Sequence, residues 1–283
     1  AWAQQFEECV WLDSNEYAQK HSSFEAVLAV DALTSLRSSY QDAFKNLREF
    51  QGFSKDWLFG YLSYDLKNDL EQLESNNIDG LGFPDLYFFQ PKKLIKIGSN
   101  EVIFLYLNMV AEEIDNDFNA ICNFQQESKS EVSHPVKIKL RIHKDEYQHK
   151  VAAMLAHIHR GDIYEANFCQ EFFAEGTQIN PLETYVKLNR ISKPPFAVFL
   201  KLSDKYLLSA SPERYLRKSG NEILSQPIKG TAKRALTYEE DLKLVESLKT
   251  DPKERSENVM IVDLVRNDLS RIAKKGSVRV DEL

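Results

Sequence analysis

The order of secondary-structure signals in the second half of the chain most constrains the fold. Four short segments rich in β-branched and aromatic residues follow one another at 196–202, 206–210, 215–218 and 222–228. Two helical stretches come next, at 238–248 and 252–272. A run of strands followed by helices predicts an α+β fold. A doubly wound parallel sheet would instead alternate strands with helices along the chain.

The first hundred residues are also rich in predicted strands. The apolar or aromatic segments are 26–30, 57–64, 87–89, 93–97 and 102–109. A helix is predicted near residues 40–50, where aromatic and leucine side chains recur every three or four positions. Together the two halves predict a sheet-rich, two-layer core with helices outside.

A polar stretch marks the predicted domain boundary. Residues 125–130 contain no apolar side chain, and residues 128–135 add serine, charge and a proline. We therefore predict a sheet-rich N-terminal subdomain at 1–127 and a second unit at 136–283. The second unit is expected to begin with a helix around 147–158. A strand at 163–173 and a short helix at 181–189 should follow.

Charge and hydropathy exclude two broad classes of function. The 283 residues carry a net charge of −7, which argues against general nucleic-acid binding because that requires a basic surface. The longest apolar run has six residues, at 102–107, and a membrane-spanning helix needs about 20. We therefore expect that the protein binds neither nucleic acid nor a membrane.

The cysteines favour a cytoplasmic location. Cys9, Cys122 and Cys169 are few, odd in number and far apart, so we expect buried thiols rather than disulfides or a zinc site. The sequence also contains no Asn-x-Ser/Thr glycosylation site. His157 and His159 are two positions apart on a predicted helix, so their side chains point in different directions and a metal pair is not expected.

The helix at 252–272 carries two acidic residues with two open interpretations. Asp251 suits the N-cap position, and Pro252 suits the first helical position. Glu254 and Glu257 then share one face. They form either a capped, solvated first turn or a carboxylate pair that binds a hard cation such as Mg²⁺. The apolar run 259–262 predicts that this helix is largely buried.

A predicted hairpin places a lysine near a carboxylate. If its turn centres on Gly220, Glu213 lies opposite Pro227, and Lys229 lies diagonally across from Glu213 on the same face. Lys229 is then either one half of an ion pair or, when desolvated, a nucleophile or acid–base group. Gly230 allows the backbone to turn and to approach a ligand closely.

Four motifs in series resemble those of the chorismate-utilising enzymes. They are GDIYEAN at 161–167, SPER at 211–214, QPIKGT at 226–231 and DPKERSEN at 251–258, and VDLVRNDL at 262–269 continues the match. Residues 144–272 resemble the first half of the catalytic domain of that family. The N-terminal half resembles the more divergent sheet of the component I subunits. Family members continue for well over a hundred residues beyond the position of Leu283, so the last part of that domain is absent.

Two positions resemble the aminodeoxychorismate synthase branch of the family. Anthranilate synthases typically carry alanine at the position of Lys229, and many relatives carry histidine at the position of Asn258. The resemblance implies a transferase that aminates chorismate at C4 to give 4-amino-4-deoxychorismate, on the route to p-aminobenzoate and folate. Anthranilate or isochorismate synthesis on the same fold is one alternative. A non-catalytic chorismate- or tryptophan-binding module is another.

The resemblance also implies roles in binding. Mg²⁺ is expected on the ring carboxylate of chorismate, with Glu257 as a direct ligand and Glu254 close by or bound through water. Thr231 and the backbone amides around Gly230 are expected to hold carboxylate oxygens of the substrate.

The implied chemistry uses Glu213 and Lys229. Glu213 protonates the departing 4-hydroxyl as a general acid, and neutral Lys229 adds at C2. Ammonia then enters at C4 and expels the lysine. The resemblance implies that a separate glutamine amidotransferase subunit supplies the ammonia, and no Cys-His-Glu triad of that type is visible in this sequence.

A second pocket is implied in the N-terminal half. The segment 12–14, which ends at Ser14, resembles the one that holds tryptophan in the family. The segment 194–196, which includes Pro195 and Phe196, resembles the loop that closes that pocket. The alternative is that Ser14 is a turn residue and that Pro195 and Phe196 only pack at the entry to a strand.

Overall fold

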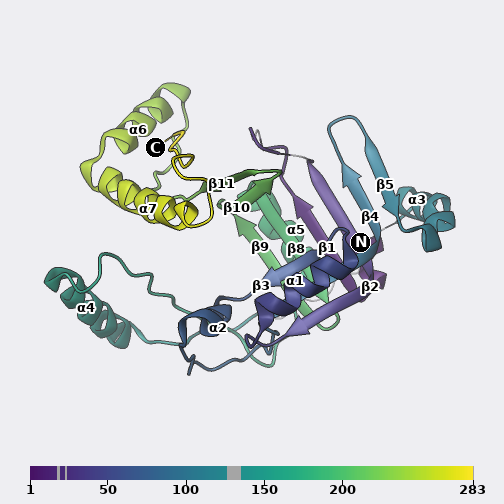
Figure 1. The fold of residues 1–283 in the computed structure, drawn as a ribbon, viewed down its shortest axis with the longest axis horizontal. Helices are drawn as coiled ribbons and strands as arrows, with labels where there is room; N and C mark the ends of the chain where they lie inside the picture. The colour runs from purple at the N-terminus through teal and green to yellow at the C-terminus, as the bar shows by residue number, and fades with distance from the viewer. Residues whose placement is uncertain (18–19, 23, 126–134, 283) are drawn as a thin grey trace.

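A seven-stranded antiparallel sheet forms the centre of the structure, a computed structural model that describes residues 1–17, 20–22, 24–125 and 135–282 (Figure 1). The strand order is β3-β4-β2-β1-β8-β9, and β5 pairs with β4. The strands are β1 (Glu8–Asp13), β2 (Ala26–Ser38), β3 (Phe59–Leu62), β4 (Leu86–Ile97), β5 (Val102–Tyr106), β8 (Phe196–Leu202) and β9 (Lys205–Ser211).

Helices and two small two-stranded sheets complete the fold. The α-helices are α1 (Ala43–Ser54), α2 (Lys67–Glu71), α3 (Ile114–Cys122), α4 (Lys144–Arg160), α5 (Pro181–Ser192), α6 (Tyr238–Thr250) and α7 (Pro252–Ser270). One small sheet is the hairpin of β10 (Arg214–Ser219) and β11 (Glu222–Gln226), and the other pairs β6 (Lys139–Leu140) with β7 (Phe172–Phe173), on either side of α4 in the sequence. Three short 3-10 helices are η1 (Trp2–Gln5), η2 (Tyr64–Leu66) and η3 (Asn108–Glu113). The α+β prediction is confirmed.

The two longest strands are longer than the apolar pattern predicts. β2 continues past residue 30 through Asp31, whose φ of 61° is left-handed, and through a bulge between Ala32 and Thr34. Lys92 of β4 holds the Asp31 carboxylate at 2.9 Å. Pro91, which lacks an amide hydrogen, faces the same irregularity, so the predicted strands at 87–89 and 93–97 form one strand.

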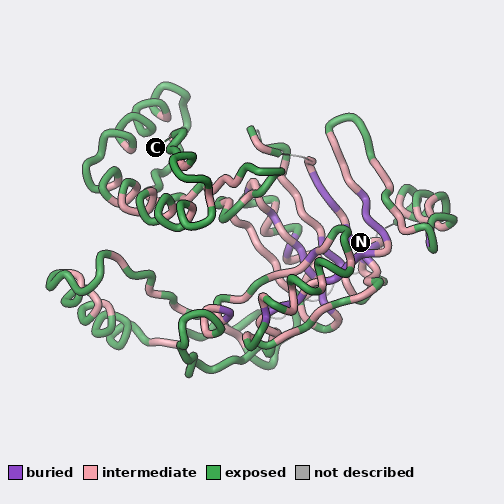
Figure 2. Tube along the Cα trace, in the orientation of Figure 1, coloured by how far each residue is buried: buried purple, intermediate pink, exposed green. Residues whose placement is uncertain are grey.

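The central sheet joins strands from both sides of the predicted boundary. β1 pairs with β2 on one edge and with β8 on the other, and Trp11 lies opposite both Leu28 and Phe199. The buried side chains lie mainly in this sheet, as the purple segments of Figure 2 show. The largest apolar cluster draws on β1, β2, β3, β4 and β8. The predicted linker at 128–135 lies outside the described residues except for Pro135.

A buried lysine ties the N-terminal segment to the sheet. Lys93 of β4 is only 4% exposed, and its Nζ donates to both Glu113 and Asp117 at 2.6 Å. Its ammonium also lies 5.3 Å from the ring centroid of Phe6. Burial disfavours the charged ammonium, but these two carboxylates raise the pKa of Lys93 above its ordinary value.

Substitution of Lys93 by methionine is expected to lower the free energy of unfolding by about 1–3 kcal/mol. The change leaves the largely buried Asp117 carboxylate without its cation, and Glu113 can turn to water. Urea unfolding followed by circular dichroism measures the loss. Lys96→Met on the same strand is the control and should change stability by about 0.5 kcal/mol or less. Equal losses of unfolding free energy in both variants would contradict a stabilising role of the ion pairs of Lys93.

The second half packs more loosely than predicted. In the described chain α4, α6 and α7 contain no buried residue, and they appear green and pink in Figure 2. The expectation that α7 is largely buried is therefore wrong, because no described sheet covers its apolar side. The strand predicted at 163–173 is also wrong. Only Phe172 and Phe173 of that segment lie in a strand, since β6 offers just two residues for pairing.

The cysteine prediction holds for one residue of three. Cys9 is buried in the sheet, and burial raises the pKa of its thiol to about 12, so it is unreactive at neutral pH. Cys122 and Cys169 are exposed, which corrects the expectation of buried thiols. None of the described helices combines the length and the hydrophobicity that crossing a membrane requires.

Candidate active site

The β10–β11 hairpin positions Glu213 just before its first strand. A two-residue turn at Gly220 and Asn221 connects the strands, and Gly220 adopts a left-handed φ of 56°. A bulge shifts the register so that Arg214 pairs with Gln226 at the base. Glu213 then lies at the hairpin entrance, where its Oε1 accepts a hydrogen bond from the Ile228 amide at 3.1 Å.

Lys229 has a different carboxylate partner from the one that the hairpin predicted. Its Nζ donates to Oε1 of Glu165 at 2.8 Å, across 64 positions of sequence. The side chains of Lys229 and Glu165 are 22% and 31% exposed. The other oxygen of Glu165, Oε2, is sealed from solvent and has no hydrogen-bond partner among the described residues. The Lys229 ammonium therefore faces a half-buried carboxylate from the segment that follows α4.

Gly230 brings the loop after β11 against α7. A methyl group at Gly230 would collide with the Oε2 atom of Glu254 and lie 2.9 Å from its Cδ atom. Only glycine allows this approach. The residue next to Lys229 in the loop therefore lies directly against the Glu254 side chain of α7.

The capping of α7 does not use the Glu254 side chain. Asp251 caps the helix, because its Oδ1 accepts from the amides of Lys253 and Glu254 at 2.9 and 3.0 Å. The backbone amide of Asp251 donates to the Ser247 carbonyl, so the reciprocal capping bond to a glutamate side chain is not made. Glu254 Oε2 is buried and unpartnered among the described residues.

Glu257 lies one turn further along the same face of α7. Glu254, Glu257 and Asn258 are half-buried, whereas Arg255 and Ser256 between them are exposed. The Oε1 atom of Glu257 is 3.7 Å from the Lys253 ammonium. Thr231, which follows Gly230, is exposed.

The two glutamates of α7 fit a hard cation by their chemistry. The buried, unpartnered Glu254 Oε2 is an oxygen ligand without a competing donor in the described residues. Mg²⁺ usually takes one or two protein carboxylates and completes its shell with water and substrate oxygens. Across the described part of the chain, no cluster of three or more histidine, cysteine, aspartate or glutamate side chains could hold a metal alone. Any ion held here therefore needs ligands beyond this pair.

The structure also brings together the segments of the second predicted pocket. Asn15 follows Ser14 in a left-handed conformation, with its amide bound to Asp13 Oδ1 at 2.8 Å. Its side-chain amide donates to the Pro194 carbonyl at 2.7 Å and exchanges hydrogen bonds with Asn189 at 2.9 Å. Pro194 is buried, and Ser14, Pro195 and Phe196 are half-buried.

The two candidate sites are neighbours in the fold. Phe196 of β8 pairs with Ser211 of β9, two residues before Glu213. The guanidinium of Arg214 lies 4.9 Å above the Phe196 ring, and its Nε donates to Gln226 Oε1 at 2.9 Å. Burial, with the nearby Arg217, lowers the pKa of Arg214. Arg214 thus contacts the second pocket and the strand that leads to Lys229.

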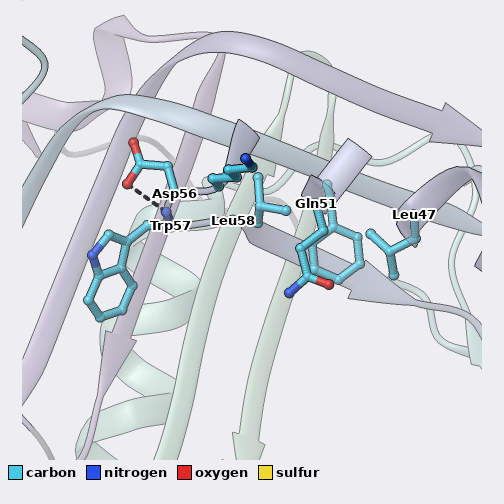
Figure 3. A pocket seen from close by; sticks show the side chains of 7 residues that line it. Leu47, Gln51, Asp56, Trp57 and Leu58 are labelled. Atoms are coloured by element: carbon cyan, nitrogen blue, oxygen red, sulfur yellow. Dashed lines mark hydrogen bonds between the residues drawn. The ribbon is translucent and has the colours of Figure 1, made fainter. Parts of the chain in front are cut away.

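Two surface hollows lie elsewhere. One of about 580 Å³ opens between α1, the segment that leads from α1 to β3, and Phe88 of β4, and Figure 3 shows its seven lining side chains. There the Asp56 carboxylate accepts from the Trp57 amide at 2.7 Å. Another of about 590 Å³ runs along the start of α7 past Arg255 and Val259. Neither of these two hollows includes Glu213, Lys229 or Glu254.

Sequence reasoning missed three residues that organise these sites. Glu165 lies inside the GDIYEAN motif, but its partner is distant in sequence and no local pattern reveals it. Asn15 and Arg214 adjoin predicted residues, and Asn15 after Leu-Asp-Ser is a turn signal that could have been read. His157 bonds Asp162 at 2.8 Å beside Arg160, and His159 takes no part in that group.

Comparison with known proteins gives the family. A model described as chorismate binding enzyme matches residues 7–283. The anthranilate synthase component I-like protein of Synechocystis sp. is 32% identical over 240 residues, covering 84% of this chain and 49% of that protein. Aminodeoxychorismate synthase component 1 of Klebsiella aerogenes is 41% identical over 140 residues, covering 50% and 31%. The chain therefore spans half or less of the length of these relatives.

A solved structure shows the same fold. Anthranilate synthase component I from Streptococcus pneumoniae TIGR4 matches with a TM-score of 0.77 at 22% identity, covering 94% of this chain and 67% of that one. The match of the family model to nearly the whole chain establishes that the protein belongs to the chorismate binding enzyme family.

Proposed function

We propose that the protein carrying this chain aminates chorismate at C4 and forms 4-amino-4-deoxychorismate. The observation that carries the proposal is the position of Lys229. A lysine amine lies in the loop that contacts Glu254 through Gly230, and Glu213 binds the same loop through the Ile228 amide. An amine at this point suits covalent attack on the substrate ring.

Each residue in or next to the loop has a proposed role. Lys229 forms a bond to ring carbon C2, and Glu213 gives a proton to the hydroxyl that leaves C4. Backbone amides around Gly230 and the exposed Thr231 hydroxyl hold carboxylate oxygens of the substrate. Ammonia then attacks C4 and releases Lys229. A glutamine amidotransferase subunit is the proposed source of ammonia, in line with the component 1 names of the relatives.

Mg²⁺ is part of this proposal. Glu257 and Glu254 would hold it, since both are half-buried on one face of α7 and Glu254 Oε2 is unpartnered among the described residues. When bound, the ion would neutralise a carboxylate of the dianionic substrate. The half-buried residues Ser14, Pro195 and Phe196 are proposed to contact a tryptophan in the neighbouring pocket. A cytoplasmic location, which the three scattered cysteines favour, completes the proposal.

One incubation tests the proposed function. The full-length protein is supplied with chorismate, Mg²⁺ and ammonium, and the product is identified by mass and chromatography. The expected product is 4-amino-4-deoxychorismate. Anthranilate, isochorismate or unchanged chorismate would each overturn the proposal and identify the reaction class that replaces it.

Anthranilate synthesis is the second candidate. The observation that favours it is the longer match to the anthranilate synthase component I-like protein, which covers 84% of this chain. The match to aminodeoxychorismate synthase component 1 covers half of the chain at higher identity. Lys229 favours the first candidate, because anthranilate formation needs no amine attached to the protein.

Substitution of Glu257 by glutamine is expected to shift the Mg²⁺ titration of activity at least tenfold toward higher concentration. Loss of a carboxylate ligand weakens a hard cation strongly. Loss of one charge near a helix N-terminus costs stability by only about 0.3–1 kcal/mol. Glu246→Gln on the exposed side of α6 is the matched control. A lowered melting temperature with an unchanged titration would favour a purely structural role.

A further inference from the structure

We infer that Glu165 is the group that takes the proton from Lys229 when the lysine becomes a nucleophile, and that returns it afterwards. The inference rests on the proposed function and deepens it. Lys229 can form a bond to carbon only as a neutral amine, so its proton must go to an acceptor. The Glu165 carboxylate is hydrogen-bonded to that amine at 2.8 Å.

The surroundings of the pair favour this transfer. The Lys229 and Glu165 side chains are mostly removed from solvent, and Glu165 Oε2 is buried without a partner in the described residues. Separated charges gain little where water is excluded, because the desolvation cost of each ion offsets their attraction. When a substrate covers the loop, the neutral pair of carboxylic acid and amine is the form that loses least solvation free energy.

Other charged groups on the neighbouring elements have different tasks. Glu213, at the entrance to β10, accepts from the Ile228 amide and faces the same loop. Glu254 of α7 lies against Gly230, and Glu257 lies near Lys253. The hydrogen bond of the Lys229 ammonium goes to Glu165. This contact distinguishes Glu165 as the acceptor.

The proton balance closes over both steps. In the first step the proton of Lys229 moves to Glu165, and the Nζ–C2 bond forms. The ring double bonds shift to C1=C6 and C4=C5, the C4–O bond breaks, and Glu213 gives its proton so that water leaves. In the second step ammonia bonds to C4, the double bonds return, and the C2–Nζ bond breaks. Glu165 then returns its proton to Lys229, and the new C4 ammonium gives one to Glu213.

The Glu165→Gln variant is expected to lower kcat at pH 7 by about 10²- to 10⁴-fold while KM for chorismate changes little. Glutamine keeps the size and a hydrogen bond but accepts no proton. Lys229 must then give its proton to solvent, and transfer of one proton to solvent becomes about tenfold more favourable with each pH unit. The ratio of variant to wild-type kcat should therefore rise about tenfold per unit between about pH 6.5 and 8.5.

The ratio isolates Glu165 from the other titrating groups. The pH effects of Glu213, the substrates and free ammonia are common to both proteins and cancel. Glu165→Asp keeps an acceptor and should show a ratio independent of pH. Glu175→Gln is the matched control, because Glu175 also accepts from a lysine, Lys139, at 2.7 Å but in an exposed pair. Its kcat and pH profile should equal those of the wild type.

The outcomes are distinguishable. If the wild type forms another product, the proposed function and the role of Glu165 are both wrong. If the wild type forms 4-amino-4-deoxychorismate but the Glu165→Gln ratio does not change with pH, or exceeds one, only the role of Glu165 is overturned. Thermal melting checks that the variant folds, and Glu165→Ala, which also lacks an acceptor, replaces it if it does not.

Discussion

Replacement of Lys229 by alanine is expected to reduce ammonia-dependent formation of 4-amino-4-deoxychorismate by on the order of 10³-fold or more. Removal of a nucleophile that forms a covalent intermediate removes the whole reaction path that depends on it. The fold should persist, because Lys229 lies in the loop after β11 and, among the described residues, its ammonium pairs with the half-buried Glu165 at the margin of the structure rather than in the core. Product formation is measured by mass, and folding by circular dichroism.

The size and the product of any residual activity carry further information. Slow turnover, or a shift toward an anthranilate-type product, is compatible with covalent catalysis, because ammonia or water can attack C2 when the lysine is absent. Lys233→Ala is the matched control, since Lys233 is exposed four residues further along the same loop. Turnover close to that of the wild type in Lys229→Ala would overturn covalent catalysis.

A second measurement tests the same step without turnover. With chorismate but no ammonia, the wild-type protein should gain the mass of chorismate minus water, and peptide mapping should place that mass on Lys229. The alanine variant should gain nothing. An adduct on another lysine would reassign the nucleophile while leaving the product unchanged.

Periodicity predicted most of the elements but not how they assemble. The α5, α6 and α7 helices lie within a few residues of their predicted bounds, because caps such as Asp251 and prolines such as Pro181 mark helix starts locally. Two predicted strands proved to be one, because Pro91 faces a bulge rather than ending the strand. The pairing of β1 with β8 joins residues almost two hundred positions apart, and no local signal encodes it.

The residues of the candidate site come from sequence motifs, but their contacts could not be predicted. Glu213, Lys229, Gly230 and Glu254 are marked by motifs, and hairpin geometry placed Glu213 at the strand entrance. The partner of Lys229 could not be predicted, because residues 161–171 follow no regular period and form almost no strand. The apolar pattern of α7 indicated a buried helix, but no described sheet covers its apolar side and α7 contains no buried residue.

A contact between Gly230 and Glu254 leads to the last large expected effect. Gly230→Ala is expected to lower activity about 10- to 100-fold and to move the Mg²⁺ titration to higher concentration, as losses in the support of a metal ligand generally do. The new methyl group would overlap Glu254 Oε2 and lie 2.9 Å from its Cδ, so the carboxylate must move. Stability should change little, since the displaced atoms end a flexible side chain.

The controls separate displacement of Glu254 from a general effect of alanine. Gly52→Ala in α1 introduces the same methyl group with no atom within 4 Å and should leave activity unchanged. Glu254→Asp shortens the displaced side chain by one methylene. Combined with Gly230→Ala, it should lose less activity than the two single changes added together predict, because the shorter carboxylate leaves room for the methyl group. Additive losses, or an unchanged Mg²⁺ titration in Gly230→Ala, would show that the approach of Gly230 to Glu254 has no part in binding the metal.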